Sequence, residues 1–164
     1  MLSIMTERAM AVFDVDGVVA DVRHRLRHIA NRPRNWPAFF AAAGRDPLLA
    51  EGADLVREYA RDHELVWLTG RPERLRAVTE RWFVERGLPA GRLLMRGDDD
   101  RRPARDFKAG RLERLAAQGT IAVVVDDDPD VVRRLKRDGY PVRLADWVPH
   151  AASLRAAQER DGRT

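Results

Sequence analysis

The chain has 164 residues, of which 45% are hydrophobic; this is enough for one core and predicts a single domain over residues 1–164. It contains no cysteine and no apolar run long enough to span a membrane, so we expect a cytoplasmic protein whose metal ligands would be oxygen atoms suited to a hard cation such as Mg²⁺. The net charge of +4 arises from 30 basic and 26 acidic residues, a mixture that is typical of solvated helix faces and only weakly favours a nucleic-acid partner.

The hydrophobic pattern alternates between the short period of strands and the longer period of helices. The first half predicts a strand over 9–14, helices within 22–44, a helix over 52–62, a strand over 65–68, and a helix over 72–86 that ends at Gly87. The second half predicts a strand over 92–95, a polar loop over 97–105, a helix ending at Gly119, a strand over 121–125, a helix over 129–138 and a last strand over 141–144. This order predicts the α/β class, with a doubly wound, Rossmann-like parallel sheet whose ligands lie beyond the carboxyl ends of the strands.

The first strand ends in Phe13-Asp14-Val15-Asp16-Gly17, which places two carboxylates one residue apart. Side chains at positions i and i+2 of a strand point the same way, so Asp14 and Asp16 would crowd like charges together. A cation or a shared proton relieves such crowding. We interpret the pair as part of a Mg²⁺ site, although Asp and Gly also favour turns.

Two later segments place polar residues at the same edge of the predicted sheet. The strand over 65–68 runs into Thr69-Gly70-Arg71, and the strand over 121–125 runs into Asp126-Asp127. Between them, Lys108 begins a helical stretch and is one of only two lysines in the chain. Each pattern also has a purely structural reading; Asp128-Pro129, for example, is typical of a helix N-cap followed by a first-turn proline. Their shared position after strands predicts that they converge.

Taken together, these motifs resemble, in order and spacing, those of the haloacid dehalogenase-like (HAD) superfamily, which consists mostly of phosphatases. The resemblance covers about residues 9 to 145 and rests on the acids at 14–17, Thr69, Lys108 and the acidic pair at 126–127. It implies a HAD-type sheet with a small helical cap inserted at about 21–50. It also implies a Mg²⁺-dependent phosphomonoesterase that works through an aspartyl-phosphate intermediate.

The resemblance assigns a role to each motif. Asp14 would be the nucleophile, and Asp16 would protonate the leaving alcohol and later activate water. Thr69 would bind phosphoryl oxygens, and Lys108 would balance the charge shared by Asp14 and the phosphate. The implied Mg²⁺ ligands are Asp14, the main-chain carbonyl of Asp16, and Asp127, with Asp126 assisting through water.

Within the superfamily, the chain is most similar to the 3′-phosphatase domains of polynucleotide kinases. The similarity implies that the substrate is a nucleic-acid 3′ end or a nucleotide, and that it is contacted by Gly70, Arg71, Arg96 and Arg102. One position departs from the family pattern: an aspartate is expected four residues before the lysine, where this chain has Ala104, and Asp106 is a candidate replacement. The sequence has no Gly-x-x-x-x-Gly-Lys-Ser/Thr motif, so a kinase or ligase partner would be a separate chain.

The cap segment carries Trp36, Phe39 and Phe40 at helical spacing. Aromatic residues in this pattern are more often core than a platform for stacked bases, and we interpret them as core. A cap this short predicts an open site that admits an extended substrate as well as small phosphate esters.

Three other functions fit parts of the pattern. A small-molecule phosphatase or 5′(3′)-nucleotidase without polynucleotide activity would use the same motifs. A signalling receiver domain also gathers acids, a threonine and a lysine, but it phosphorylates an aspartate that follows its first acid pair, whereas here the Asp-x-Asp-Gly motif comes first. A nucleic-acid-binding module without catalytic activity would use the arginine excess alone.

Overall fold

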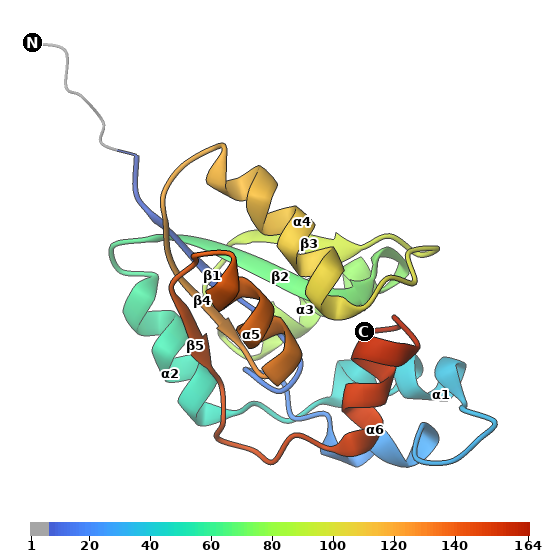
Figure 1. Ribbon diagram of the computed structural model, residues 1–164. Helices are drawn as coiled ribbons and strands as arrows, with labels where there is room; N and C mark the ends of the chain where they lie inside the picture. Colours follow the sequence, from blue (N-terminus) through green and yellow to red (C-terminus); the bar gives the residue numbers. More distant parts are fainter. Residues whose placement is uncertain (1–6) are drawn as a thin grey trace, which may run out of the picture.

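The computed structural model describes residues 7–164, which form a five-stranded parallel sheet covered by helices on both faces (Figure 1). The strand order is β3-β2-β1-β4-β5. The strands are β1 (Met10–Phe13), β2 (Glu64–Pro72), β3 (Arg92–Arg96), β4 (Ile121–Asp126) and β5 (Val142–Leu144). The helices against the sheet are α2 (Ala50–Tyr59), α3 (Arg76–Glu85), α4 (Ala104–Ala116) and α5 (Pro129–Arg137). The predicted α/β class with a doubly wound parallel sheet is confirmed.

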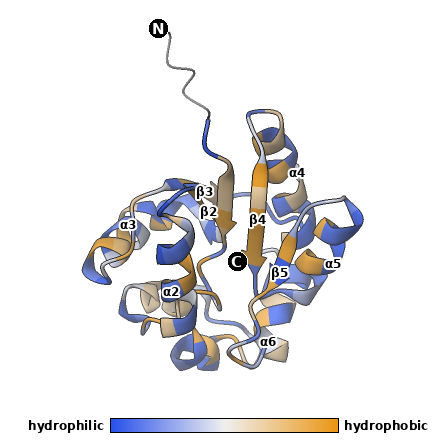
Figure 2. Cartoon of the chain, turned by 90° about the vertical axis from the view of Figure 1, so that its left-hand side faces the viewer, coloured by the Kyte–Doolittle hydropathy of each residue, from blue (hydrophilic) through white to orange (hydrophobic). Residues whose placement is uncertain are grey.

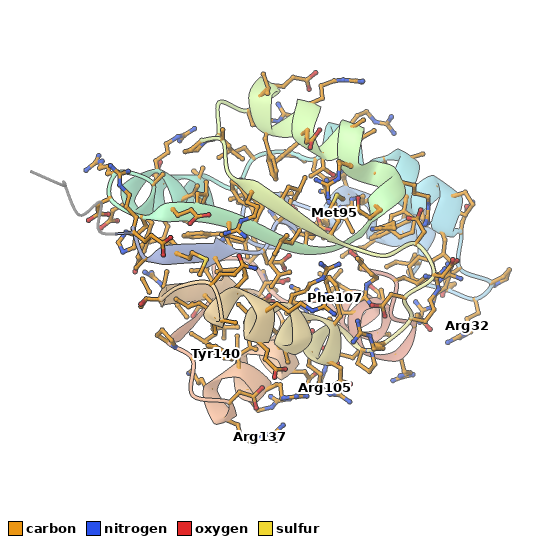
Figure 3. The ribbon with its side chains drawn as sticks, turned by 90° about the horizontal axis from the view of Figure 1, so that it is seen from above. Arg32, Met95, Arg105, Phe107, Arg137 and Tyr140 are labelled. Atoms are coloured by element: carbon orange, nitrogen blue, oxygen red, sulfur yellow. The ribbon has the colours of Figure 1, made fainter. Side chains whose placement is uncertain are left out.

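Side chains of the strands alternate between two cores. Val12 packs in the core formed with α4 and α5, whereas its neighbour Phe13 packs in the core formed with α2 and α3. Figure 2 shows the strands between these two pairs of helices. Seen from above, Phe107 of α4 lies in the interior, while Arg32 and Arg137 extend outward (Figure 3). Burial on both faces explains the continuous apolar runs of the central strands.

The strand register brings the ends of β1, β2 and β4 to one edge of the sheet. Phe13, the last residue of β1, pairs with Trp67 on one side and with Val125 on the other. The next amide, that of Asp14, donates a hydrogen bond to the carbonyl of Val125 at 3.0 Å. The polar residues at the carboxyl ends of these three strands therefore lie next to one another.

The cap segment consists of 3₁₀ turns at Arg23–His28 and Ala43–Arg45 around helix α1 (Trp36–Ala41). The side chain of Asn35 caps α1 by accepting a hydrogen bond from the amide of Ala38 at 3.0 Å. Phe39 and Phe40 are buried in a small separate core, against which Trp36 packs partly buried. This confirms that the cap aromatics are core residues.

The segment after β5 forms structure that the sequence pattern did not predict. Helix α6 (Ala152–Arg155) continues into a π-helical turn at Ala156–Arg160, and together they lie beside α1 (Figure 1). Ala157 completes the cap core. Ion pairs from Asp161 to Arg34 (3.1 Å) and from Glu159 to Arg105 (2.6 Å) tie the segment to the cap and to α4.

Helix and strand boundaries differ from the prediction in two places that matter for the site. Strand β2 extends to Pro72, where we expected a helix to begin, because Pro72 pairs with Arg96 of β3. Helix α4 begins at Ala104, so Lys108 lies one turn inside the helix rather than at its start. Gly87 ends α3 with φ +64°, as predicted. Within residues 7–164, no helix combines the length and apolar character needed to cross a membrane.

Candidate active site

Asp14 lies at the centre of the carboxyl edge, immediately after the middle strand β1, and is buried. Its Oδ1 accepts a hydrogen bond from the amide of Val15 at 2.7 Å. Its Oδ2 lies 3.2 Å from Nζ of Lys108. Burial is the main cause that raises the pKa of Asp14 to about 7; Lys108 opposes this shift, and the carboxylates of Asp126 and Asp16 add to it.

Lys108 reaches this edge from α4 and is itself buried. Its Nζ lies 2.5 Å from Oδ2 of Asp126 in addition to its contact with Asp14. Burial alone would lower the pKa of Lys108, but these two carboxylates outweigh it and raise the pKa above its usual value. Lys108 therefore remains an ammonium group that bridges the ends of β1 and β4.

The residues fit a hard divalent cation. Oxygen atoms of Asp14, Asp126 and Asp127 lie within 4.8 Å of one another, and all three side chains are buried. Burial and the neighbouring carboxylate of Asp14 raise the pKa of Asp127 well above its usual value. Asp127 Oδ1 is buried and has no hydrogen-bond partner among residues 7–164. Three crowded carboxylates with a free oxygen are the donor set that Mg²⁺ and similar cations prefer.

Two details distinguish the members of this acidic cluster. Both oxygens of Asp126 are already engaged, Oδ2 by Lys108 and Oδ1 by the amide of Asp128 at 3.0 Å. Gly17 allows Asp127 to approach the first motif, since a Cβ atom at Gly17 would lie 2.1 Å from Asp127 Oδ2. Asp127 is thus better placed than Asp126 to coordinate a cation directly.

Asp16 lies in a different environment, surrounded by guanidinium groups. Its Oδ1 accepts hydrogen bonds from Nη2 and Nε of Arg71 at 2.6 and 2.9 Å, and from Nη2 of Arg25 at 3.0 Å. Burial would raise the pKa of Asp16, but Arg71 and Arg25 together hold it well below its usual range. In this arrangement Asp16 is a carboxylate.

The sequence did not single out Arg25 or Asp46, which complete this cluster. Asp46 is fully buried and accepts hydrogen bonds from both Arg25 and Arg71. Arg25 stands among several arginines and histidines of the cap, and no local pattern distinguishes it from them. Asp46, before Pro47, reads as an ordinary turn residue. Only the folded cap shows which of these residues face Asp16.

Thr69 and Gly70 immediately precede Arg71, which contacts Asp16, and both are buried. The hydroxyl of Thr69 accepts a hydrogen bond from the amide of Arg71 at 3.1 Å. A Cβ atom at Gly70 would lie 2.1 Å from the carbonyl carbon of Thr164, so the segment after α6 rests directly on this glycine. The expectation of an open site is therefore wrong: the short cap is supplemented by residues 152–164, which cover the edge of the sheet.

Two predicted substrate-binding arginines lie outside the cluster. Arg96 is buried, donates from Nε to the carbonyl of Gly70 at 3.2 Å and from Nη1 to that of Arg102 at 2.7 Å, and stacks over the ring of Phe107. Arg96 thus holds the main chain at Gly70 and Arg102 in place without contacting Asp16. The exposed side chain of Arg102 instead pairs with Asp100 at 2.6 Å.

Asp106 does not replace the aspartate that is absent at position 104. Its carboxylate pairs with Arg134 of α5 at 2.7 Å and is partly exposed. Ala104, in contrast, is buried in the core under α4. Because positions 104 and 106 are two residues apart in one helix, their side chains face different directions. Asp106 therefore does not compensate for Ala104.

The chain is similar in sequence to a phosphatase family and to a protein named as a nucleotidase. A family model described as "Polynucleotide kinase PNKP phosphatase domain" matches residues 8–143. Among curated proteins, "Putative nucleotidase BH1399" of Halalkalibacterium halodurans is 27% identical over 123 residues, which cover 69% of this chain and 62% of that protein. The chain thus spans less than two thirds of this relative.

Solved structures show the same fold. The structure of the Pnkp1/Rnl/Hen1 RNA repair complex matches with a TM-score of 0.71 at 22% identity, covering 85% of this chain and 43% of that chain. The haloacid dehalogenase-like hydrolase SP0104 of Streptococcus pneumoniae matches with a TM-score of 0.62 at 13% identity, covering 94% and 93% of the two chains. At these identities the likeness establishes the architecture.

Proposed function

Because the chain belongs to the family of polynucleotide kinase PNKP phosphatase domains, within the HAD phosphatases, it is a hydrolase of phosphoric monoesters, and we propose that it removes the phosphate from nucleic-acid 3′ ends. We further propose that it requires Mg²⁺ and forms an aspartyl-phosphate on Asp14. The observation that carries this proposal is the convergence of Asp14, Lys108 and Asp127 at the end of the central strand.

The chemistry divides into two transfers. An oxygen of Asp14 forms a bond to phosphorus while the bond from phosphorus to the leaving alcohol breaks, and Asp16 gives a proton to that alcohol. Asp16 then takes a proton from a water molecule whose oxygen attacks the phosphorus, which frees Asp14 and releases phosphate. Lys108 holds the Asp14 carboxylate in place by its 3.2 Å contact and balances the added negative charge.

A divalent cation, when bound, would neutralise charge on the phosphoryl oxygens and so allow an anionic substrate to approach several carboxylates. The residues that would hold it are Asp14, the main-chain carbonyl of Asp16, and Asp127, whose Oδ1 has no partner within residues 7–164. Asp126 would act indirectly, since Lys108 and the amide of Asp128 occupy its oxygens.

The proton on Asp16 needs an explanation, because Arg25 and Arg71 keep this group ionised. A phosphoryl group beside them would compete for the same guanidinium N–H groups. As those contacts to Asp16 weaken, its affinity for a proton rises. Binding of the substrate phosphate would thus prepare Asp16 to act as the acid.

Arginines beside the covered edge support a polyanionic substrate. Arg163 precedes Thr164, and its pKa is lowered first by burial and then by the nearby charges of Arg101 and Arg74. Three guanidinium groups that lie this close repel one another, and an anion bound between them would relieve the repulsion. The phosphates that adjoin the 3′ end of a strand would supply that charge.

A nucleotidase is the second candidate, and the 27% identity to a relative with that name favours it. The test is phosphate release in Mg²⁺ from a 3′-phosphorylated oligonucleotide, its 5′-phosphorylated counterpart and a nucleoside 3′-monophosphate. We expect kcat/KM for the 3′-phosphorylated strand to exceed that for the monomer by about tenfold or more, and to fall with added salt. Equal or better turnover of the monomer would assign the protein to the nucleotidases instead.

The rest of an end-healing reaction would need activities that lie outside these 164 residues. They contain no phosphate-binding loop of the kinase type, so 5′-phosphorylation and strand joining would be carried out elsewhere. The similar chain of the Pnkp1/Rnl/Hen1 structure is part of an RNA repair complex. We propose that this domain likewise acts together with such enzymes.

A further inference from the structure

Asp46 connects the two arginines that surround Asp16. It follows the 3₁₀ turn Ala43–Arg45 at the end of the cap and is fully buried. Its Oδ1 accepts a hydrogen bond from Nε of Arg25 at 2.9 Å, and its Oδ2 accepts from Nη2 of Arg25 at 2.9 Å and from Nη2 of Arg71 at 2.8 Å. Oδ1 of Asp46 also contacts Nε2 of the partly buried His24 at 2.6 Å. Asp46 and Asp16 therefore share the same two guanidinium groups, and Asp46 has a third partner in His24.

Asp46 is also anchored by contacts that do not involve Arg25 or Arg71. Its main-chain carbonyl accepts hydrogen bonds from Nε1 of Trp82 at 2.8 Å and from Nη2 of Arg86 at 3.0 Å. Trp82 belongs to α3 on the main domain and is fully buried. Asp46 is thus fixed relative to the sheet, and its carboxylate in turn holds the guanidinium group of Arg25 in position.

The contacts leave one donor of Arg25 free. Its guanidinium carbon lies 4.4 Å from the ring centre of Phe39, and Asp46 and Asp16 engage Nε and Nη2. Nη1 is buried and finds no acceptor among residues 7–164. On Arg71, by contrast, Nη1 donates to the hydroxyl of Thr79 at 3.2 Å. An unpaired buried guanidinium N–H is costly unless a ligand accepts from it.

We propose that Asp46 is a positioning residue for phosphate recognition: it holds Arg25 and Arg71 so that the free N–H group of Arg25 is directed to the phosphoryl group of the substrate. This inference rests on the proposed function. Buried ion pairs often stabilise a fold no more than apolar packing of the same volume. The main consequence of this network therefore lies in the fixed direction of its donors, and loss of the Asp46 carboxylate would leave both guanidiniums to compete for Asp16.

The test compares Asp46→Asn and Asp46→Glu with the wild type. We expect Asp46→Asn to raise KM for p-nitrophenyl phosphate and the inhibition constant of inorganic phosphate by about tenfold or more, because small displacements of a phosphate clamp have large effects. Asp46→Glu keeps the charge and should give intermediate values of both constants. Asp21→Asn is the matched control: it removes the pair with Arg23 at 2.7 Å, which also lies in the cap region, and should leave both constants unchanged.

A merely structural role would lower the melting temperature and the amount of active enzyme while KM and the phosphate inhibition constant stayed at wild-type values, and this result would overturn the proposal. If Asp46→Asn does not fold, Asp46→Glu carries the test, and wild-type constants in that variant would be equally decisive. A wild type that hydrolyses no phosphomonoester would refute the proposed function alone. The affinity for inorganic phosphate, measured by calorimetry in Mg²⁺, would still compare Asp46 variants with the wild type.

Discussion

The hydroxyl of Thr164 donates a hydrogen bond to Oδ2 of Asp16 across 3.2 Å, although 148 positions separate the two residues in the sequence. An alcohol that has just left a phosphoryl group and taken its proton from Asp16 would make the same contact. The carbonyl carbon of Thr164 also rests on Gly70, where a Cβ atom would approach to 2.1 Å. If Asp16 is the acid, as proposed, the segment 161–164 occupies space that the leaving group of a substrate would need.

Loosening this segment should therefore improve substrate binding. Gly162 has φ +57°, and a Cβ atom there would lie 2.1 Å from the carbonyl oxygen of Arg101. Alanine in this backbone conformation costs about 1 kcal/mol, and the close approach to the Arg101 carbonyl adds to that cost, so the equilibrium should shift by roughly fivefold at least. We expect Gly162→Ala to lower KM for p-nitrophenyl phosphate by about that factor, measured in steady-state kinetics, with little change in kcat.

Gly87→Ala is the control for backbone strain. Gly87 also has a positive φ, +64°, but a Cβ atom added there would meet nothing within 4 Å, and the residue ends α3 away from the carboxyl edge of the sheet. We expect this variant to lose stability without a change in KM. Equal KM values in Gly162→Ala and Gly87→Ala would contradict the prediction that segment 161–164 competes with the substrate.

Asp14→Asn should abolish phosphate release without unfolding the protein. The amide is nearly the same size but is a poor nucleophile, so kcat should fall by about 10³-fold or more. Because one of three crowded carboxylates is removed, the melting temperature in a chelator should rise at alkaline pH. Asp106→Asn, on the outer side of α4, is the control and should keep its turnover. Substantial turnover by Asp14→Asn would exclude Asp14 as the nucleophile.

The part of the site that the sequence could predict depends on strand ends. Asp14, Thr69 and Asp126 each follow an apolar strand, and in a parallel sheet such residues must share one edge. Lys108 was recognisable because lysine is rare in this chain. The position of these residues at one edge therefore follows from the local hydrophobic pattern and from the rule that parallel strands end at the same edge.

The rest depends on contacts that no local pattern encodes. Arg25 reaches Asp16, and Asp46 reaches Arg71, only because the cap folds back onto the sheet. Each of these cap residues resembles its neighbours in the sequence. The cover over Gly70 comes from residues 152–164, where a short helix and a π-helical turn leave a weak periodic signal. Asp106 shows the opposite case, since it was a candidate in the sequence but helical register turns it toward Arg134 and away from the site.

Cation affinity should rise with pH around neutrality. Burial raises the pKa of Asp14 to about 7 without a cation, and that of Asp127 is raised as well. Below that pH the carboxyl holds a proton that must leave when a cation binds, whereas above it the carboxylate is already free. We expect Mg²⁺ affinity to increase by about tenfold per pH unit between about pH 6 and 7 for each proton released, and less steeply above.

Calorimetry in buffers of different ionisation enthalpy measures the protons released on Mg²⁺ binding. Asp14→Asn has no such proton at this position and should show a weaker dependence on pH as well as a lower affinity. The same affinity at about pH 6 and about pH 8, with no proton release, would contradict the buried acidic cluster as the cation site.

Asp128 should make the protein less stable as pH rises. Its Oδ1 caps α5 by accepting from the amide of Asp130 at 2.9 Å, while its buried Oδ2 has no donor partner within residues 7–164. Burial and then the neighbouring carboxyl group of Glu159 raise the pKa of Asp128 to about 7. Between pH 3.8, which is the usual pKa of an aspartate, and about pH 7, Asp128 has lost its proton in the unfolded chain but keeps it in the folded chain. Rising pH therefore favours unfolding over this range and has no further effect above it.

Asp128→Asn removes this penalty, because asparagine is an equally good cap and cannot ionise. We expect its free energy of unfolding, from urea titrations in a chelator, to equal that of the wild type near about pH 4 and to exceed it by about 2 kcal/mol near pH 8. Asp130→Asn is a control of opposite sign, since the hydrogen bond from Arg155 lowers the pKa of Asp130 and its contribution is present at neutral pH and lost on acidification. That variant should be less stable than the wild type at neutral pH. If Asp128→Asn were also destabilised near pH 8, Asp128 would have to be ionised and favourably paired in the folded protein.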